Sequence, residues 1–272
     1  MSLHLDGVAL ITGAGHGIGR ECALAYAAEG VKAILLADTN YDAALDAAQE
    51  TETVATNPAF TAVATQVDVT DPTSIVGMVD KATRAFGRVD YYVDNTRASH
   101  GHIAATGPQA LEDRLWPDNA AKPILYCIHA VAEVMKAQHV GRYKSRGRVR
   151  EASRGAIITV GAPCTVLGGD TVAENTVLGL IRKAALAYAA DGIRVNAICP
   201  GWMDNVDPIH SGKLDPLLMK RVIPMTRMAK PEEIADVVLF LSSPRASYVT
   251  GAAWAVDGGL MLQVDTANER AK

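Results

Sequence analysis

Several features are scarce or missing in this sequence of 272 residues, and each absence excludes a class of protein. No CxxC pair occurs among the cysteines, which argues against a zinc site or a disulfide framework and favours a reducing compartment. The net charge is −4, so no general basic field favours nucleic acid as a partner. No apolar run approaches the roughly 18 residues that a membrane helix needs. The four cysteines are Cys22, Cys127, Cys164 and Cys199.

The first residues also lack a targeting pattern, because no basic stretch is followed there by an apolar one. We therefore expect a cytoplasmic protein that neither enters a membrane nor binds nucleic acid. The hydrophobic content of 49% is enough for a large core. Since repeats, low-complexity tracts and linkers are absent, the sequence predicts one domain over residues 1–272.

The most informative stretch is a glycine-rich turn between a short apolar run and a helical pattern. Residues 12–19 read Thr-Gly-Ala-Gly-His-Gly-Ile-Gly. Strand, glycine turn and helix in this order predict a cradle for a dinucleotide pyrophosphate. In this cradle Gly13 forms the tight turn, Gly17 lets the backbone approach the phosphates, and Gly19 lets helix and strand pack closely. A tight strand–helix turn without a ligand is the alternative.

A carboxylate follows the second apolar run at a position suited to the adenosine ribose. Asp38 lies about 20 residues beyond the glycine turn, where it can accept hydrogen bonds from both ribose hydroxyls. It would repel a 2′-phosphate, so NAD(H) is favoured, with NADP(H) left open. An alternative role for Asp38, which does not exclude the first, is to cap a helix that begins near Tyr41.

Further apolar runs alternate with helical patterns of about a dozen residues or more along the chain. This alternation predicts crossover connections and therefore an α/β fold, in which helices cover both faces of a doubly wound parallel sheet. The expected strands are 8–11, 31–37, 61–67, 88–93, 155–160, 193–198 and 252–256. The expected helices begin near residues 20, 41 and 72, and later ones cover 111–138, 170–190 and 231–242.

Two segments do not fit this alternation. Residues 141–154 contain six basic side chains and, with Tyr143, a single aromatic one. This composition favours a basic, solvated surface loop over a site for nucleic acid or another anionic partner. Residues 206–230 mix polar and apolar side chains with three prolines, which predicts a mobile segment that covers a substrate site.

Several motifs, taken in order, resemble the short-chain dehydrogenase/reductase family over nearly the whole chain. This resemblance implies a single Rossmann-type domain with a seven-stranded parallel sheet and a bound nicotinamide dinucleotide. It also implies a small-molecule substrate and a homodimer or homotetramer. The motifs are residues 12–19, Asp68-Val69, Asn119, residues 192–201 (Gly-Ile-Arg-Val-Asn-Ala-Ile-Cys-Pro-Gly), residues 231–235 and residues 248–259.

The resemblance also implies which residues hold the ligands. Asp68 and Val69 fall at the adenine edge, and Asn205 stands near the position that binds the carboxamide. The expected cofactor-binding residues are Gly13, Gly15, His16, Gly17, Ile18, Gly19, Asp38, Asp68, Val69, Asn95, Arg97, Glu174, Pro200, Gly201, Met203 and Asn205. The expected substrate-binding residues are Ala162, Trp202 and Asp170. Trp202 and Met203 suggest an apolar substrate wall, although core packing explains them nearly as well.

The sequence departs from the family at three of its four catalytic positions. Asp170 stands where the family has tyrosine, Glu174 where it has lysine, and the serine position falls near Ala162. Only Asn119 is retained, so the usual proton donor is absent. In addition, the Asn-Asn-Ala-Gly segment of the family reads Asp-Asn-Thr-Arg at residues 94–97.

The two acids suggest a different chemistry. Two carboxylates four residues apart on one helix face can hold a proton between them or stabilise a cation such as an iminium. An iminium needs no acid for hydride addition, because it already carries the positive charge. Glu174 can also accept hydrogen bonds from the nicotinamide ribose. The alternative is that Asp170 only caps its helix and that Glu174 is a solvated first-turn acid.

Three functions remain open on these residues. The first is a reductase of an apolar imine or iminium in alkaloid-like secondary metabolism. In its missing catalytic residues and their acidic replacements, the sequence is similar to bifunctional fungal indole-alkaloid enzymes. These enzymes reduce an iminium and also guide a [4+2] cyclisation as Diels–Alderases. The second is a cyclase or isomerase in which the dinucleotide is structural, and the third is a non-catalytic binding protein.

Overall fold

The protein is described from a computed structural model, which covers residues 3, 5–96, 118–145, 147–161, 171–204 and 223–263. For residues 118–120, 144–145 and 171–176 it describes the backbone alone. Within these ranges no helix combines the length and the apolar character that crossing a membrane requires.

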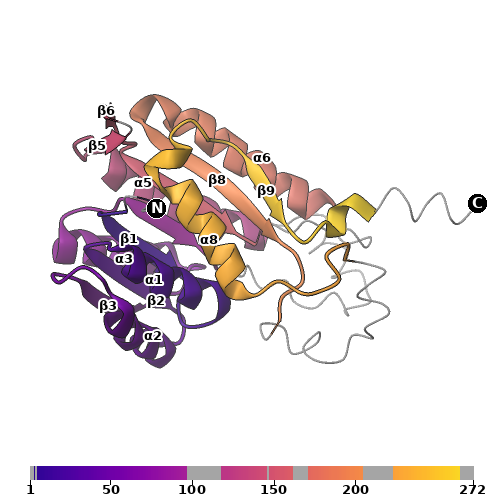
Figure 1. Ribbon diagram of the computed structural model, residues 1–272, viewed down its shortest axis with the longest axis horizontal. Coiled ribbons are helices and arrows are strands. Elements are labelled where there is room, and N and C mark those ends of the chain that lie inside the picture. The colour runs from indigo at the N-terminus through magenta and orange to yellow at the C-terminus, as the bar shows by residue number, and fades with distance from the viewer. Residues whose placement is uncertain are drawn as a thin grey trace, which may run out of the picture.

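A seven-stranded parallel sheet forms the centre of a single α/β domain (Figure 1). The strand order is β3-β2-β1-β4-β7-β8-β9, which confirms the predicted doubly wound fold. The order reverses between β1 and β4, and in such sheets ligands bind beyond the carboxyl ends of the strands at this reversal. The strands are β1 (Val8–Thr12), β2 (Ala33–Asp38), β3 (Thr61–Gln66), β4 (Tyr91–Asp94), β7 (Gly155–Val160), β8 (Ile193–Pro200) and β9 (Ala253–Val256).

Helices cover both faces of the sheet and create two hydrophobic cores (Figure 1). On one face pack α1 (Gly17–Glu29), α2 (Tyr41–Val54) and α8 (Pro231–Ser242). On the other pack α3 (Pro72–Phe86), α5 (Asp118–Lys136) and α6 (Thr171–Tyr188). Because helices bury both faces, every residue of β1 and β7 is buried, which is why both strands are continuous apolar runs in the sequence. Short 3-10 helices are η1 (Ala189–Asp191), η2 (Pro244–Ala246) and η3 (Leu260–Gln263).

Some predicted bounds are wrong at their ends. The strand expected from residue 88 begins at Tyr91, although the backbone of Asp90 already hydrogen-bonds to Val8 and Ala156 on the two neighbouring strands. Asp90 also accepts the backbone N–H of Val8 through Oδ2 at 2.9 Å, which fixes the start of the neighbouring strand β1. The first helix begins at Gly17, three residues before the predicted start. Residues 111–117 of the long predicted helix lie outside the described residues.

The prediction of a loop over residues 141–154 is wrong, because this segment contains an antiparallel hairpin. Its strands are β5 (Arg142–Ser145) and β6 (Arg148–Glu151), and Gly147 in the turn has a φ of +74°. The hydroxyl of Tyr143 donates to the Pro244 carbonyl at 3.2 Å and so holds the hairpin on the domain. All four side chains of β6 are exposed, so the predicted surface position is confirmed. Because this hairpin has no apolar face, its strands lack the alternation of apolar and polar residues by which a strand is predicted from sequence.

Candidate functional site

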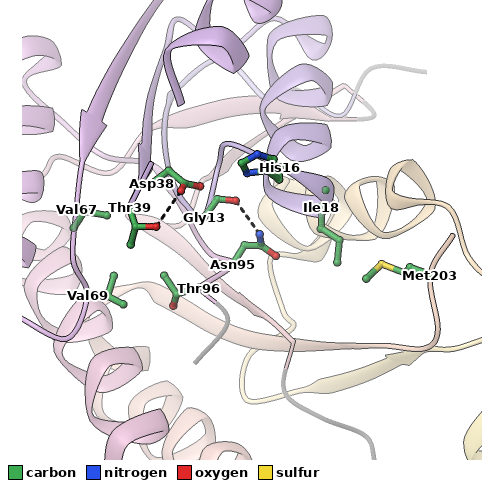
Figure 2. Close-up of a pocket in the computed structure, with 11 residues that line it drawn as sticks. Gly13, His16, Ile18, Asp38, Thr39, Val67, Val69, Asn95, Thr96 and Met203 are labelled. Atoms are coloured by element: carbon green, nitrogen blue, oxygen red, sulfur yellow. Dashed lines mark hydrogen bonds between the residues drawn. The ribbon is translucent and has the colours of Figure 1, made fainter. Parts of the chain in front are cut away.

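A cavity of about 360 Å³ lies at the carboxyl ends of β1, β2 and β4, where the strand order reverses. Figure 2 shows Asp38, Thr39, Val67 and Val69 at one end of this cavity and Ile18 and Met203 at the other. The full lining consists of Gly13, His16, Gly17, Ile18, Asp38, Thr39, Val67, Val69, Asn95, Thr96 and Met203. The space is therefore elongated between a polar end and an apolar end.

The glycine-rich turn forms one wall of the cavity and requires its glycines. Gly13 has a φ of +62°, and a Cβ there would lie 2.4 Å from the carbonyl oxygen of Asn95. A Cβ on Gly19 would lie 2.1 Å from the carbonyl oxygen of Gly13. The Asn95 amide donates to that same Gly13 oxygen at 3.0 Å (Figure 2). The turn is therefore held close to the end of β4, and this position brings the beginning of α1 to the cavity.

The beginning of α1 suits an anion. Within the described residues, the side chain of its N-cap residue His16 forms no capping hydrogen bond, and the first turn contains no acidic residue. The first N–H groups of the helix and the positive end of its dipole therefore face the cavity wall without a competing carboxylate. These residues fit the phosphates of a dinucleotide.

Asp38 ends β2 at the polar end of the cavity. Its Oδ2 accepts the backbone N–H of Gly15 at 2.8 Å, and its Oδ1 accepts that of Asn40 at 3.0 Å. The cap of α2 is Asn40, whose side chain accepts the N–H groups of Asp42 and Ala43 at 3.1 and 3.2 Å. The alternative in which Asp38 caps this helix is therefore wrong. Its carboxylate is instead a negative charge in the cavity wall, tied to the glycine turn.

The adjacent edge of the cavity is apolar. Val67 and Val69 line it, whereas the exposed Asp68 between them does not. The Asp68 carboxylate accepts the Thr70 hydroxyl at 2.7 Å and the Thr70 N–H at 2.8 Å, and these bonds lower its pKa. Two valines are a suitable surface for a flat aromatic base.

Beneath Thr96, a second aspartate ends β4 in a different environment. Asp94 is fully buried. Its Oδ1 accepts the N–H of Thr96 at 3.2 Å, the Thr96 hydroxyl, and the Thr12 hydroxyl at 3.3 Å. Within the described part of the chain, its Oδ2 has no hydrogen-bond partner, and neither has Oγ1 of the buried Thr159. Burial raises the pKa of Asp94, while the hydrogen bonds from Thr96 and Thr12 act in the opposite direction.

The predicted site residues fall into four groups. Gly13, His16, Gly17, Ile18, Asp38, Val69, Asn95 and Met203 line the cavity, while Gly15 and Gly19 belong to the turn itself. Pro200 ends β8, followed by Gly201 and Trp202, and Asp68 lies beside the cavity. Asn119 and Glu174 lie in the first turns of α5 and α6, where the backbone alone is described. Arg97, Ala162, Asp170, Asn205 and residues 206–222 of the predicted covering segment lie outside the described residues.

Three cavity residues are absent from the sequence prediction, namely Thr39, Val67 and Thr96. Each is the direct neighbour of a predicted residue at the carboxyl end of a strand. The rule that ligands bind at these ends would have included all three. The buried Asp94 was not predicted either, because a charged residue after an apolar run usually marks the exposed end of a strand.

The fold and the cavity define a nucleotide-binding protein of the doubly wound α/β class. Comparison with known proteins narrows this class. A family model described as enoyl-(acyl carrier protein) reductase matches residues 13–261. A short-chain dehydrogenase of Penicillium roqueforti (anuF) is 45% identical over 276 residues, which cover 98% of this chain and 100% of that protein. Another, from Aspergillus ruber (fogB), is 36% identical over 270 residues, covering 96% and 98%.

Solved structures agree with these relatives. A hydroxysteroid dehydrogenase from Escherichia coli is 28% identical with a TM-score of 0.74, covering 95% of this chain and 98% of that one. A short-chain type dehydrogenase/reductase from Mycobacterium marinum is also 28% identical, with a TM-score of 0.75 and coverage of 95% and 97%. The chain therefore belongs to the short-chain dehydrogenase/reductase family, whose members are oxidoreductases that generally bind NAD(P)(H).

Proposed function

We propose that this protein is an NAD(H)-dependent reductase that acts on an apolar substrate with a C=N bond and works without the serine, tyrosine and lysine of its family. The observation that carries the cofactor assignment is the position of Asp38. Its carboxylate lies in the cavity wall and is fixed by the N–H of Gly15 at 2.8 Å. A fixed negative charge favours ribose hydroxyls as hydrogen-bond donors and disfavours a 2′-phosphate.

Different parts of the cavity are suited to different parts of the dinucleotide. The glycine turn and the start of α1 hold the phosphates, Asp38 holds the adenosine ribose, and Val67 and Val69 contact the base. Ile18 and Met203 form the apolar end, which excludes water from the reacting groups. The dinucleotide, when bound, supplies a hydride from its nicotinamide ring.

The preference for a C=N bond rests on the replaced catalytic residues. Glu174 lies in the first turn of α6, and Asp170 precedes this helix directly in the sequence. A ketone requires a proton donor as the hydride arrives, and the tyrosine that supplies it in the family is absent. Carboxylates at these two positions stabilise a positively charged iminium instead. This charge complementarity favours imines over ketones as substrates.

The test compares matched substrates. Purified protein with NADH is given cyclic imines that carry apolar substituents, and in parallel the ketones of the same carbon skeleton. We expect loss of nicotinamide absorbance with the imines alone, and a decrease of about 10²-fold or more in Asp170→Asn. Reduction of the ketones at equal rate would overturn the substrate class. Product formed without NADH loss would indicate a cyclase or isomerase, and failure to bind NADH would overturn the whole proposal.

We also propose that the protein forms a homo-oligomer through α5 and α6. The two helices pack on one another, and both leave large apolar side chains exposed, namely Leu125 and Tyr126 on α5 and Leu186 on α6. Leu186 is 82% exposed, and exposed apolar side chains on two adjacent helices are the kind of surface that packs against a partner. Sedimentation velocity of Leu186→Glu against wild type tests this proposal, and an unchanged sedimentation coefficient would contradict it.

A further inference from the structure

Four polar groups meet where β1, β4 and β7 end, below the cavity floor. Thr12, Asp94 and Thr159 are neighbours in the registers of these parallel strands and project to the same face of the sheet. Tyr92 lies one pleat below on that face, and its hydroxyl is 3.4 Å from Oγ1 of Thr12. All four residues are at most 2% exposed. Asp94 is therefore a carboxyl group enclosed by hydroxyl groups and protein.

The hydrogen bonds of Asp94 are distributed unequally between its two oxygens. Oδ1 accepts three donors, two from Thr96 and one from Thr12. Oδ2 is buried and has no partner among the residues that the structure describes. A buried carboxylate oxygen without a partner is costly because its charge is not solvated, and protonation removes that charge. The burial of Oδ2 therefore favours the neutral acid, while the three donors to Oδ1 act in the opposite direction.

Among the residues that the structure describes, no opposite charge pairs with Asp94 to favour the ionised form. Of the described titratable side chains, Tyr92 on the same strand and Cys127 on α5 interact electrostatically with Asp94. Both are themselves neutral groups, and burial raises the pKa of each. Among the described residues, no lysine, arginine or histidine forms an ion pair with Asp94. Burial and the lack of a described cationic partner thus favour the neutral acid, and they outweigh the opposing effect of the donors to Oδ1.

Thr96 connects this acid to the cavity. Its hydroxyl contacts Oδ1 of Asp94, and the same residue lines the cavity. Figure 2 shows Thr96 beside Asn95 between the two ends of the cavity. A carboxyl group can exchange its two oxygens by rotation about its last bond, because this torsion is soft and nearly two-fold. The acid proton can therefore reach the Thr96 hydroxyl.

From this arrangement we infer that Asp94 is the proton store of the active site and that Thr96 delivers its proton into the cofactor cavity. The inference rests on the proposed reductase function. The imine nitrogen takes a proton from the Thr96 hydroxyl, the Thr96 oxygen takes one from Asp94, and Asp94 becomes a carboxylate. The iminium carbon then accepts the hydride, so NADH is oxidised to NAD⁺ and the imine is reduced to an amine. Water returns the proton to Asp94 after product release.

The first test needs neither cofactor nor turnover. Infrared difference spectra of the unliganded protein at neutral pH are recorded for wild type, Asp94→Asn and Asp46→Asn. Asparagine is the residue that the family has at position 94, so this variant keeps a hydrogen-bonding side chain of the same size. Asp46 is an exposed residue of α2 and serves as the matched control. We expect a protonated-carboxyl band that is lost in Asp94→Asn alone. Absence of this band from wild type would overturn the inference.

The second test concerns delivery. With NADH and a neutral imine, Asp94→Asn and Thr96→Val should each reduce the rate by about 10²-fold or more, and Thr96→Ser should restore it. The losses in Asp94→Asn should diminish at low pH, where the imine is protonated in solution. Equal rates in wild type and Asp94→Asn would overturn the delivery step. Lack of turnover in wild type would instead count against the proposed function, and the infrared band would still decide whether Asp94 holds the proton.

Discussion

Two aspartates that both follow apolar strands have opposite environments in this protein. Asp38 ends β2 in the cavity wall, where backbone N–H groups stabilise its charge. Asp94 ends β4 in the protein interior, where three donors share one oxygen and no described residue pairs with the other. The same residue type thus serves as a fixed charge at one strand end and as a neutral acid at another.

The charge of Asp38 should set the cofactor preference. Asp38→Asn keeps an oxygen that accepts the Gly15 N–H but removes the charge that repels a 2′-phosphate. We expect the ratio of the Kd values for NADPH and NADH to fall by about tenfold or more, which corresponds to about 1.4 kcal/mol. Fluorescence titration with both nucleotides measures this ratio. Asp42→Asn, an exposed substitution on α2, is the control, and an equal shift in both variants would contradict the prediction.

The burial of Asp94 should also appear in the pH dependence of stability. Burial raises its pKa in the folded state, so the folded protein retains a proton that the unfolded chain releases at lower pH. This contribution to the free energy of unfolding is full below the unfolded pKa and is lost as pH rises through the folded pKa. We expect wild type to lose up to about 1.4 kcal/mol per pH unit more than Asp94→Asn in this window.

Urea denaturation of both proteins over a pH series from about 4 to 8 makes this comparison. Parallel stability curves for the two proteins would show that Asp94 has the same pKa folded and unfolded.

At the scale of single elements, the glycine turn requires its glycines, whereas α3 contains a glycine that its surroundings do not require. A Cβ on Gly19 would lie 2.1 Å from the Gly13 oxygen, whereas a Cβ on Gly77, within α3, would have nothing within 4 Å. We expect Gly19→Ala to cost about 1–3 kcal/mol and to abolish NADH binding, because the turn must open. Gly77→Ala should stabilise the protein by about 0.5–1 kcal/mol. Thermal unfolding and nucleotide titration of the pair measure both effects, and a neutral Gly19→Ala would contradict the tight turn.

The elements that the sequence predicted well are those with two buried faces. Runs such as 155–160 are continuous and apolar because helices cover both sides of the sheet, and this pattern is visible without a structure. The hairpin at β5 and β6 was missed because neither strand has an apolar face. Residues of the glycine turn line the cavity, and this part of it is visible in the sequence because the turn is a local motif. The environment of Asp94 was not predicted, because it depends on Thr12 and Thr159, which are distant in sequence and meet only through strand register.

At the scale of the whole molecule, one buried cation joins parts of the chain that are far apart in the sequence. Arg194 on β8 is 5% exposed, and burial lowers its pKa to about 10. Its guanidinium donates to the carbonyls of Leu241 and Ser242 at the end of α8, at 2.6 and 3.0 Å. It also donates to the Ser153 hydroxyl at 2.9 Å, just after the hairpin. The cation is favoured there by the negative end of the helix dipole.

Replacing Arg194 should therefore weaken the whole domain. Arg194→Lys keeps the charge but loses the planar fork of donors, so buried carbonyls remain unpaired at about 1–3 kcal/mol each. We expect a loss on the order of 2–3 kcal/mol in the free energy of unfolding by urea. Arg84→Lys, in an exposed pair with Asp80 on α3, should change it by less than about 0.5 kcal/mol. Equal effects of the two substitutions would contradict the role of the buried fork.

The two hydrophobic cores on opposite faces of the sheet have a consequence for how this protein diverges. Asp38 projects to the side of α1, α2 and α8, whereas Asp94 and Thr159 project to the side of α3, α5 and α6. The residue that recognises the nucleotide and the residue that stores the proton therefore lie on opposite faces of the central sheet. Mutations on one side can change the reaction while the other side still binds the nucleotide. A lineage can therefore change its reaction and keep its coenzyme.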